Sequence, residues 1–136
     1  MNLLFALLTP FIMATTPYSN DKEKTTTDKG EETNKQCYLG KLEIKGMCGQ
    51  YVVRIISKNK NKMNVAPTWK DPNSGKVYKN VFTVANHCSF PSSIQQGQTF
   101  NFTITNDTKN DCMTCQAFTP VPDQSIAIQV GCKKGK

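Results

Sequence analysis

The chain of 136 residues contains little of what enzymes commonly use. His87 is its only histidine, and the G-x-S-x-G, glycine-rich phosphate-loop and H-E-x-x-H motifs are all absent. Any pairing of a nucleophile with an imidazole base would have to run through His87. Only five carboxylates follow residue 36, and no pattern among them indicates catalysis. The sequence therefore predicts a protein that is not an enzyme and that uses no cofactor or metal.

The sequence also has no apolar run of the roughly 20 residues that a transmembrane helix needs. Its longest run covers residues 3–14 and is broken only by Thr9 and Pro10. Small residues follow it, so residues 1–16 are predicted to be a secretory signal peptide, with an uncleaved interfacial anchor as the alternative. Residues 17–36 are polar and of mixed charge, which predicts a disordered tether. We expect a secreted or periplasmic protein without a transmembrane helix in its mature form.

Positive charge is concentrated in the part of the chain that is expected to fold. Residues 37–136 hold 13 Lys and Arg against five Asp and Glu, a net charge of +8. Residues 17–36 carry a net charge of −1. Such a balance favours anionic partners, for example nucleic acid, acidic glycans or lipid headgroups. The alternative is that the lysines only keep a small exported protein soluble.

Short runs of β-branched and aromatic residues predict an all-β domain over residues 37–132, followed by a basic tail at 133–136. The expected strands cover residues 50–56, 63–69, 77–86, 100–105 and 126–130. An Asp-Pro-Asn-Ser-Gly turn signal makes the second and third strands a hairpin, across which Trp69 and Tyr78 are expected to meet. Five strands with this spacing predict a small five-stranded OB-like barrel stapled by disulfides, and a small β-sandwich is the alternative.

Four short strings within residues 46–130 resemble small exported bacterial proteins that carry no assigned activity. They are G-x-C-G-x-Y-V-V at 46–53, W-K-D-P-x-S-G-K at 69–76, N-V-F at 80–82, and a C-x-x-C ahead of a proline-rich loop. The resemblance implies an OB-like β-barrel and implies nothing about function.

Six cysteines predict a disulfide framework, as is usual in a small exported domain. They are Cys37, Cys48, Cys88, Cys112, Cys115 and Cys132. Six cysteines allow 15 pairings, and sequence spacing does not choose among them. One arrangement pairs Cys37 with Cys132 across the two ends of the domain. It also pairs Cys48 with Cys88, which leaves Cys112 with Cys115.

Two other interpretations of the last cysteines stay open. Cys112-Met-Thr-Cys115 has the spacing of thiol–disulfide oxidoreductases, although no helix pattern follows it to activate the thiol. The second is a tetrahedral zinc site from His87, Cys88 and these two cysteines, with the adjacency of His87 and Cys88 against it.

A candidate binding surface combines basic and aromatic side chains around the first two strand connections. In an OB barrel, the loop between the first and second strands borders the ligand face. The candidate residues in this loop and the adjoining strands are Arg54, Lys58, Lys60, Lys62, Trp69, Lys70, Tyr78 and Lys79. Positive charge interleaved with aromatic rings binds anionic or sugar-like polymers. We therefore expect a binding module for an anionic polymer, a glycan or a protein partner. The alternatives are a redox or zinc protein and a structural or inhibitory exported protein.

Overall fold

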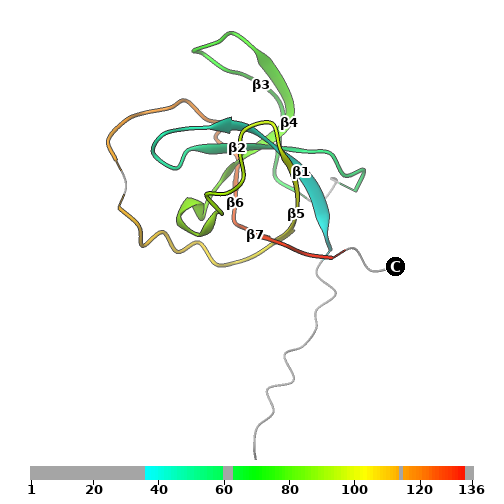
Figure 1. Ribbon diagram of the computed structural model, residues 1–136. Coiled ribbons are helices and arrows are strands. Elements are labelled where there is room, and N and C mark those ends of the chain that lie inside the picture. Colours follow the sequence, from blue (N-terminus) through cyan, green and yellow to red (C-terminus); the bar gives the residue numbers. More distant parts are fainter. Residues whose placement is uncertain (1–35, 60–62, 114, 134–136) are drawn as a thin grey trace, which may run out of the picture. The chain divides into compact units, whose positions relative to one another are not determined.

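The computed structural model describes residues 36–59, 63–113 and 115–133 (Figure 1). The expected signal peptide, nearly all of the expected tether, Lys60, Lys62 and the last three residues of the basic tail lie outside the described residues. No helix in the described ranges has the length and apolar character needed to cross a membrane.

The described chain forms one sheet of seven strands. They are β1 (Tyr38–Lys45), β2 (Tyr51–Ile55), β3 (Ala66–Lys70), β4 (Val77–Val84), β5 (Thr99–Ile104), β6 (Ser125–Ile126) and β7 (Ile128–Val130). A single 3₁₀ turn, η1 (His87–Ser89), is the one helical element in the described part. Every strand pair is antiparallel except β4 with β6, which is parallel. The prediction of an all-β domain is therefore confirmed.

The strand path runs β3-β4-β2-β1-β5-β7 and is open, so the five-stranded barrel is not confirmed. Strand β6 lies off this path and pairs with β4. Only Ala127 separates β6 from β7, which pairs with β5. In Figure 1 the far end of the β3–β4 hairpin projects from the other strands.

The sequence prediction has no strand at β1, yet β1 lies between β2 and β5 in the sheet. The glycine in β1, Gly40, is required by close packing. A Cβ at Gly40 would lie 2.9 Å from side-chain atoms of both Phe102 and Val53. The glycine that weakens the local strand pattern therefore lets β1 sit against the bulky side chains of the core.

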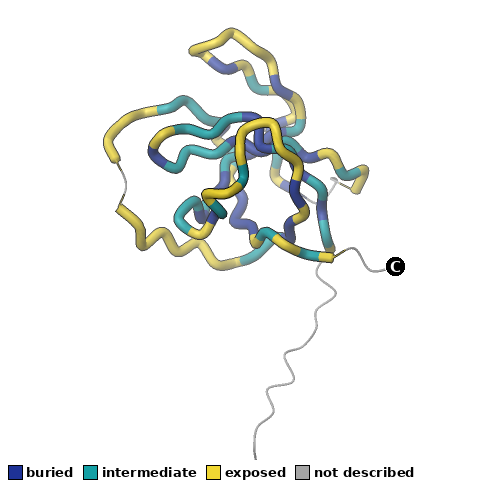
Figure 2. Tube along the Cα trace, viewed as in Figure 1, coloured by how far each residue is buried: buried dark blue, intermediate teal, exposed yellow. Residues whose placement is uncertain are grey.

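Two apolar clusters pack on opposite faces of the sheet. Successive residues of a strand point to opposite faces, and Val52 belongs to one cluster while Val53 belongs to the other. The larger cluster centres on fully buried aromatic and aliphatic side chains, including Phe82 and Phe102. The smaller cluster consists of Val52, Ala66, Tyr78 and Val81, with Ile44, Trp69 and Val121 packed against it. Figure 2 shows the buried strands inside a rim of exposed loops.

The hairpin forms as predicted. Trp69 and Tyr78 are directly opposite each other in β3 and β4, and their ring centroids lie 5.9 Å apart in a stacked arrangement. Asp71 holds the turn, because its carboxylate accepts hydrogen bonds from the Ser74 hydroxyl and from the Asn73 N–H. These hydrogen bonds, chiefly the one from Ser74, lower the pKa of Asp71 below its ordinary value.

All six cysteines form disulfides, and one of the three anticipated pairings is present. Cys37 bonds to Cys132, with 5.8 Å between their Cα atoms. The pairings of Cys48 with Cys88 and of Cys112 with Cys115 are wrong. The structure has Cys48–Cys115 and Cys88–Cys112, because the long connection after β5 returns over η1 and the start of β2. Three disulfides are typical of an oxidising extracellular or periplasmic environment.

Candidate functional site

An open hollow with a volume of about 300 Å³ lies where β1, β2 and the start of β4 meet. Its lining residues are Lys41, Glu43, Arg54, Lys76, Val77, Tyr78 and Lys79. We call it the basic hollow. It brings together three residues of the predicted binding surface, namely Arg54, Tyr78 and Lys79, from two different strands.

The basic hollow holds four cationic side chains and one carboxylate, a net charge of +3. Glu43 is only 8% exposed, and its Oε1 lies 2.8 Å from Arg54 Nε. This contact is an ion pair without hydrogen-bond geometry, since Arg54 Nε has no hydrogen-bond partner among the described residues. Lys41 Nζ lies 3.8 Å from the other carboxylate oxygen. Glu43 thus partly neutralises two of the cations and leaves Lys76 and Lys79 uncompensated.

The stacked rings of Trp69 and Tyr78 lie next to the positive side chains. Tyr78 is buried, and Lys76 Nζ lies 4.8 Å from the centroid of its ring. A cation at this distance is attracted to the negative face of the ring. Trp69 stacks on Tyr78 and is half-buried, but it does not line the hollow. The basic hollow therefore combines exposed charge with one buried aromatic ring, Tyr78.

The lining of the basic hollow does not include the other described candidates, which are Lys58, Trp69 and Lys70. Lys70 is exposed and pairs with Val77, one of the lining residues. Lys58 is exposed in the connection after β2 and is not part of the lining. The remaining two lysines of that loop lie outside the described residues. The predicted loop is thus not joined to the basic hollow by any described side chain.

Sequence reasoning missed four lining residues, of which three are charged and the fourth is Val77. Lys41 and Glu43 belong to β1, whose alternation of charged residues with Leu42 and Ile44 is a visible strand signal. Lys76 directly follows the turn glycine, and its carbonyl oxygen accepts a hydrogen bond from the Asp71 N–H at the end of the hairpin.

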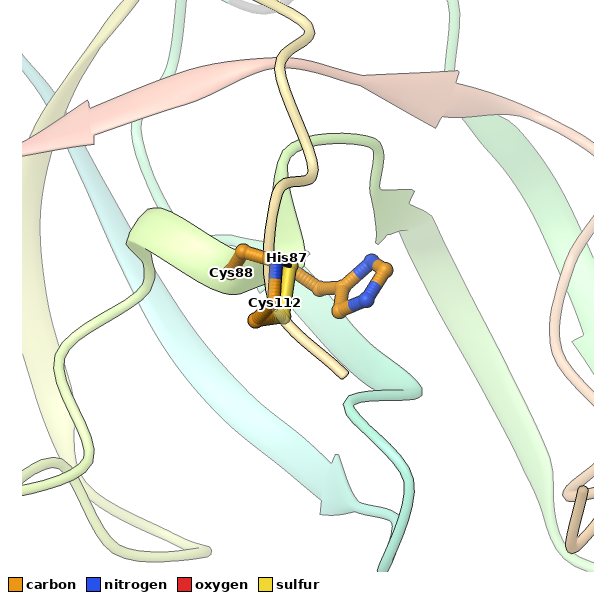
Figure 3. A group of neighbouring side chains, drawn as sticks. All are labelled: His87, Cys88 and Cys112. Atoms are coloured by element: carbon orange, nitrogen blue, oxygen red, sulfur yellow. Dashed lines mark hydrogen bonds between the residues drawn. A yellow bond between two sulfur atoms is a disulfide. The ribbon is translucent and has the colours of Figure 1, made fainter. Parts of the chain in front are cut away.

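A second hollow, with a volume of about 490 Å³, lies beside two of the disulfides. Its lining residues are Met47, Cys48, Gly49, Tyr51, His87, Cys88, Phe90, Ser92, Cys112, Met113 and Cys115. We call it the disulfide hollow. The candidate ligand atoms of His87, Cys88 and Cys112 all lie within 4.8 Å of one another (Figure 3). Both of these cysteines are in a disulfide, so neither offers a thiolate to a metal in this state.

The C-x-x-C motif does not close on itself. Cys112 bonds to Cys88, and Cys115 bonds to Cys48. A dithiol–disulfide catalyst of the expected kind exchanges electrons within one such motif. The motif instead fastens one loop to two separate segments.

No protein-family model, curated protein or solved structure matches this chain. The resemblance to small exported bacterial proteins therefore stays a prediction.

Proposed function

We propose that this protein is an exported, non-enzymatic binding module for an anionic polymer, which it binds at the basic hollow. One observation carries the proposal: Lys41, Arg54, Lys76 and Lys79 converge on one open hollow with an aromatic ring in its lining. The cations attract such a polymer, and the buried Tyr78 ring holds Lys76 in place beside it. The apolar run near the start of the sequence and the three disulfides support export.

The exposure of the cations favours a polymer over a small enclosed ligand. Lys76 and Lys79 are both exposed, and no ion pair to either is found in the described ranges. Lys70 is exposed as well and lies across the hairpin from Val77, so the positive charge continues along β3. A linear polyanion gains by contacting several such cations at once, because each contact releases a condensed counterion.

We further propose that the sheet is an OB-type barrel. The pairings that support this are β1 with β2, β2 with β4, β4 in parallel with β6, β7 with β5, and β5 with β1. Because a single residue separates β6 from β7, one short stretch of chain pairs with β4 through β6 and with β5 through β7. In this arrangement β3 is an added edge strand. The basic hollow then lies on the face of the early strands, which is the usual ligand face of OB barrels.

The test compares two double variants with equal loss of charge. Lys76→Ser with Lys79→Ser removes the uncompensated cations of the basic hollow, and Lys109→Ser with Lys133→Ser removes two exposed lysines elsewhere. The probes are a fluorescent single-stranded DNA oligonucleotide and fluorescent polygalacturonate. For the DNA, we expect the first variant to bind about tenfold or more weakly and its salt slope to fall by about 1.4.

The control decides between a site and a general charge effect. We expect the Lys109 and Lys133 variant to bind nearly as well as the unmodified protein. Equal losses in the two variants would show that only net charge matters and would overturn the proposal. If only one probe binds, the polymer class is identified. If Lys58, Lys60 and Lys62 are exchanged together for Ser and binding also weakens, the predicted loop belongs to the same surface.

A further inference from the structure

The disulfide hollow gathers three side chains with soft or borderline metal-ligand atoms from three separate segments. Met47 precedes β2, His87 begins η1, and Met113 lies in the connection after β5. Each of the three is the direct neighbour of a cysteine in the sequence. The Cys48–Cys115 and Cys88–Cys112 disulfides join these segments covalently. The two bonds therefore hold two thioethers and the only imidazole of the chain around one hollow.

The exposure of both methionines is difficult to explain by packing. Met47 is 91% exposed and Met113 is 99% exposed, whereas Met63 is 9% exposed in the core. Methionine is usually used to fill gaps in cores, and Met47 and Met113 bury little apolar surface at this exposure. Both exposed side chains lie over the same hollow. Their sulfur atoms are thus free to turn toward a common ligand.

The imidazole is held in place but has an unmet hydrogen-bonding need. His87 Nε2 is buried and has no hydrogen-bond partner among the described residues. The ring lies against the backbone of Gly49, where an added Cβ would overlap His87 Cδ2. Figure 3 shows the ring to one side of the Cys88–Cys112 disulfide. The ring is therefore fixed beside the hollow by close packing and by the neighbouring covalent bond.

We propose that Met47, His87 and Met113 form a binding site for a soft monovalent metal ion of the Cu(I) type, with all disulfides intact. Thioether sulfur selects soft ions, and imidazole is a good ligand for copper. The chain has no free cysteine, and no carboxylate is among the lining residues. Zinc is usually held by several thiolate, imidazole or carboxylate ligands, and of these the hollow offers only the His87 imidazole in this state. The hard cations are usually held by carboxylates, which the lining does not contain.

The first experiment uses the full chain with its disulfides formed and Ag(I) as a redox-inert stand-in for Cu(I). We expect one ion to bind per chain. In a sample labelled with ¹³C at the methionine methyl groups, the resonances of Met47 and Met113 are expected to move on titration. Buried Met63 serves as the internal control and is expected not to move. Titration without movement of the two exposed methionines would overturn the proposal.

The second experiment uses variants. Met47→Leu with Met113→Leu, and separately His87→Gln, are expected to weaken Ag(I) binding about tenfold or more, because each removes ligand atoms. Phe118→Leu is the matched control, since Phe118 is 84% exposed in the same connection and does not line the hollow. Near-ultraviolet circular dichroism checks that each variant is folded. Binding that appears only after the disulfides are reduced would place the site on the cysteines and overturn the thioether assignment.

Discussion

Asn86 and Ile128 form a reciprocal pair of hydrogen bonds inside the domain. Asn86 Nδ2 donates to the Ile128 carbonyl oxygen at 2.9 Å, and the Ile128 N–H donates to Asn86 Oδ1, also at 2.9 Å. Asn86 is only 3% exposed. Asn86 follows β4, and Ile128 begins β7. The Asn86 side-chain amide therefore makes the two hydrogen bonds to Ile128 that a neighbouring strand would otherwise make.

Asn86→Ala is expected to lower the free energy of unfolding by about 2–4 kcal/mol, because it leaves the buried N–H and C=O of Ile128 without partners. Urea unfolding monitored by Trp69 fluorescence measures the loss. The control is Asn73→Ala at an exposed turn position, which is expected to change stability by no more than about 0.5 kcal/mol. A loss at Asn86 no larger than that of the control would show that water replaces the amide.

Replacing Cys37 and Cys132 together by Ser is expected to cost about 2–5 kcal/mol, because this disulfide closes the longest loop, at a sequence separation of 95. The same exchange at Cys88 and Cys112, with a separation of 24, is expected to cost about 1 kcal/mol less from loop entropy. Denaturant titration with mass spectrometry of the remaining bonds gives both values. A reversed order would mean that contacts of the shorter loop outweigh chain entropy.

Glu43→Gln is expected to raise the affinity of the basic hollow for an anionic oligonucleotide by about two- to tenfold, because it removes the carboxylate that offsets Lys41 and Arg54. Stability is expected to fall by no more than about 1 kcal/mol, since the Arg54 side chain is 42% exposed. Asp123→Asn makes the same charge change at an exposed position elsewhere. An equal gain in both variants would count against a local effect.

Asp71 is expected to make the stability depend on pH in the acid range. Its pKa is lowered from 3.8 in the folded state, first by the Ser74 hydroxyl and then by the Asn73 N–H. A lowered folded pKa adds stability that is present above the unfolded value and is lost as pH falls through the folded value. In melting experiments at about pH 6 and about pH 2.5, the stability advantage over Asp71→Asn is expected to narrow at the lower pH. A constant difference would exclude this linkage.

The strands that the sequence predicts well are those whose pattern is local. Residues 100–105 alternate strictly between apolar and polar, and β5 forms there. Strand β1 was missed because Gly40 lowers its intrinsic preference for a strand, although residues 41–45 alternate between charged and apolar. Its stability comes from pairing with β2 and β5, which are distant in the sequence. Long-range pairing of this kind overrides local propensity.

In the candidate site too, the residues on strands with a clear local pattern were predicted and the residues on β1 were not. Trp69, Tyr78 and Lys79 lie on a hairpin whose turn residues are explicit, and the structure brings Tyr78 and Lys79 into the basic hollow. Lys41 and Glu43 were missed together with their strand. The disulfide partners depend on the route of residues 105–124, a connection without periodicity. Composition alone does not indicate which segments such a connection passes.

The Cys37–Cys132 bond has a mechanical consequence. It joins the residue before β1 to the residue two positions after β7, with 5.8 Å between the two Cα atoms. Tension applied through the chain before Cys37 and after Cys132 passes across this covalent link and does not load the hydrogen bonds between the strands. A pulling force therefore does not extend the chain between the two cysteines until the disulfide is reduced.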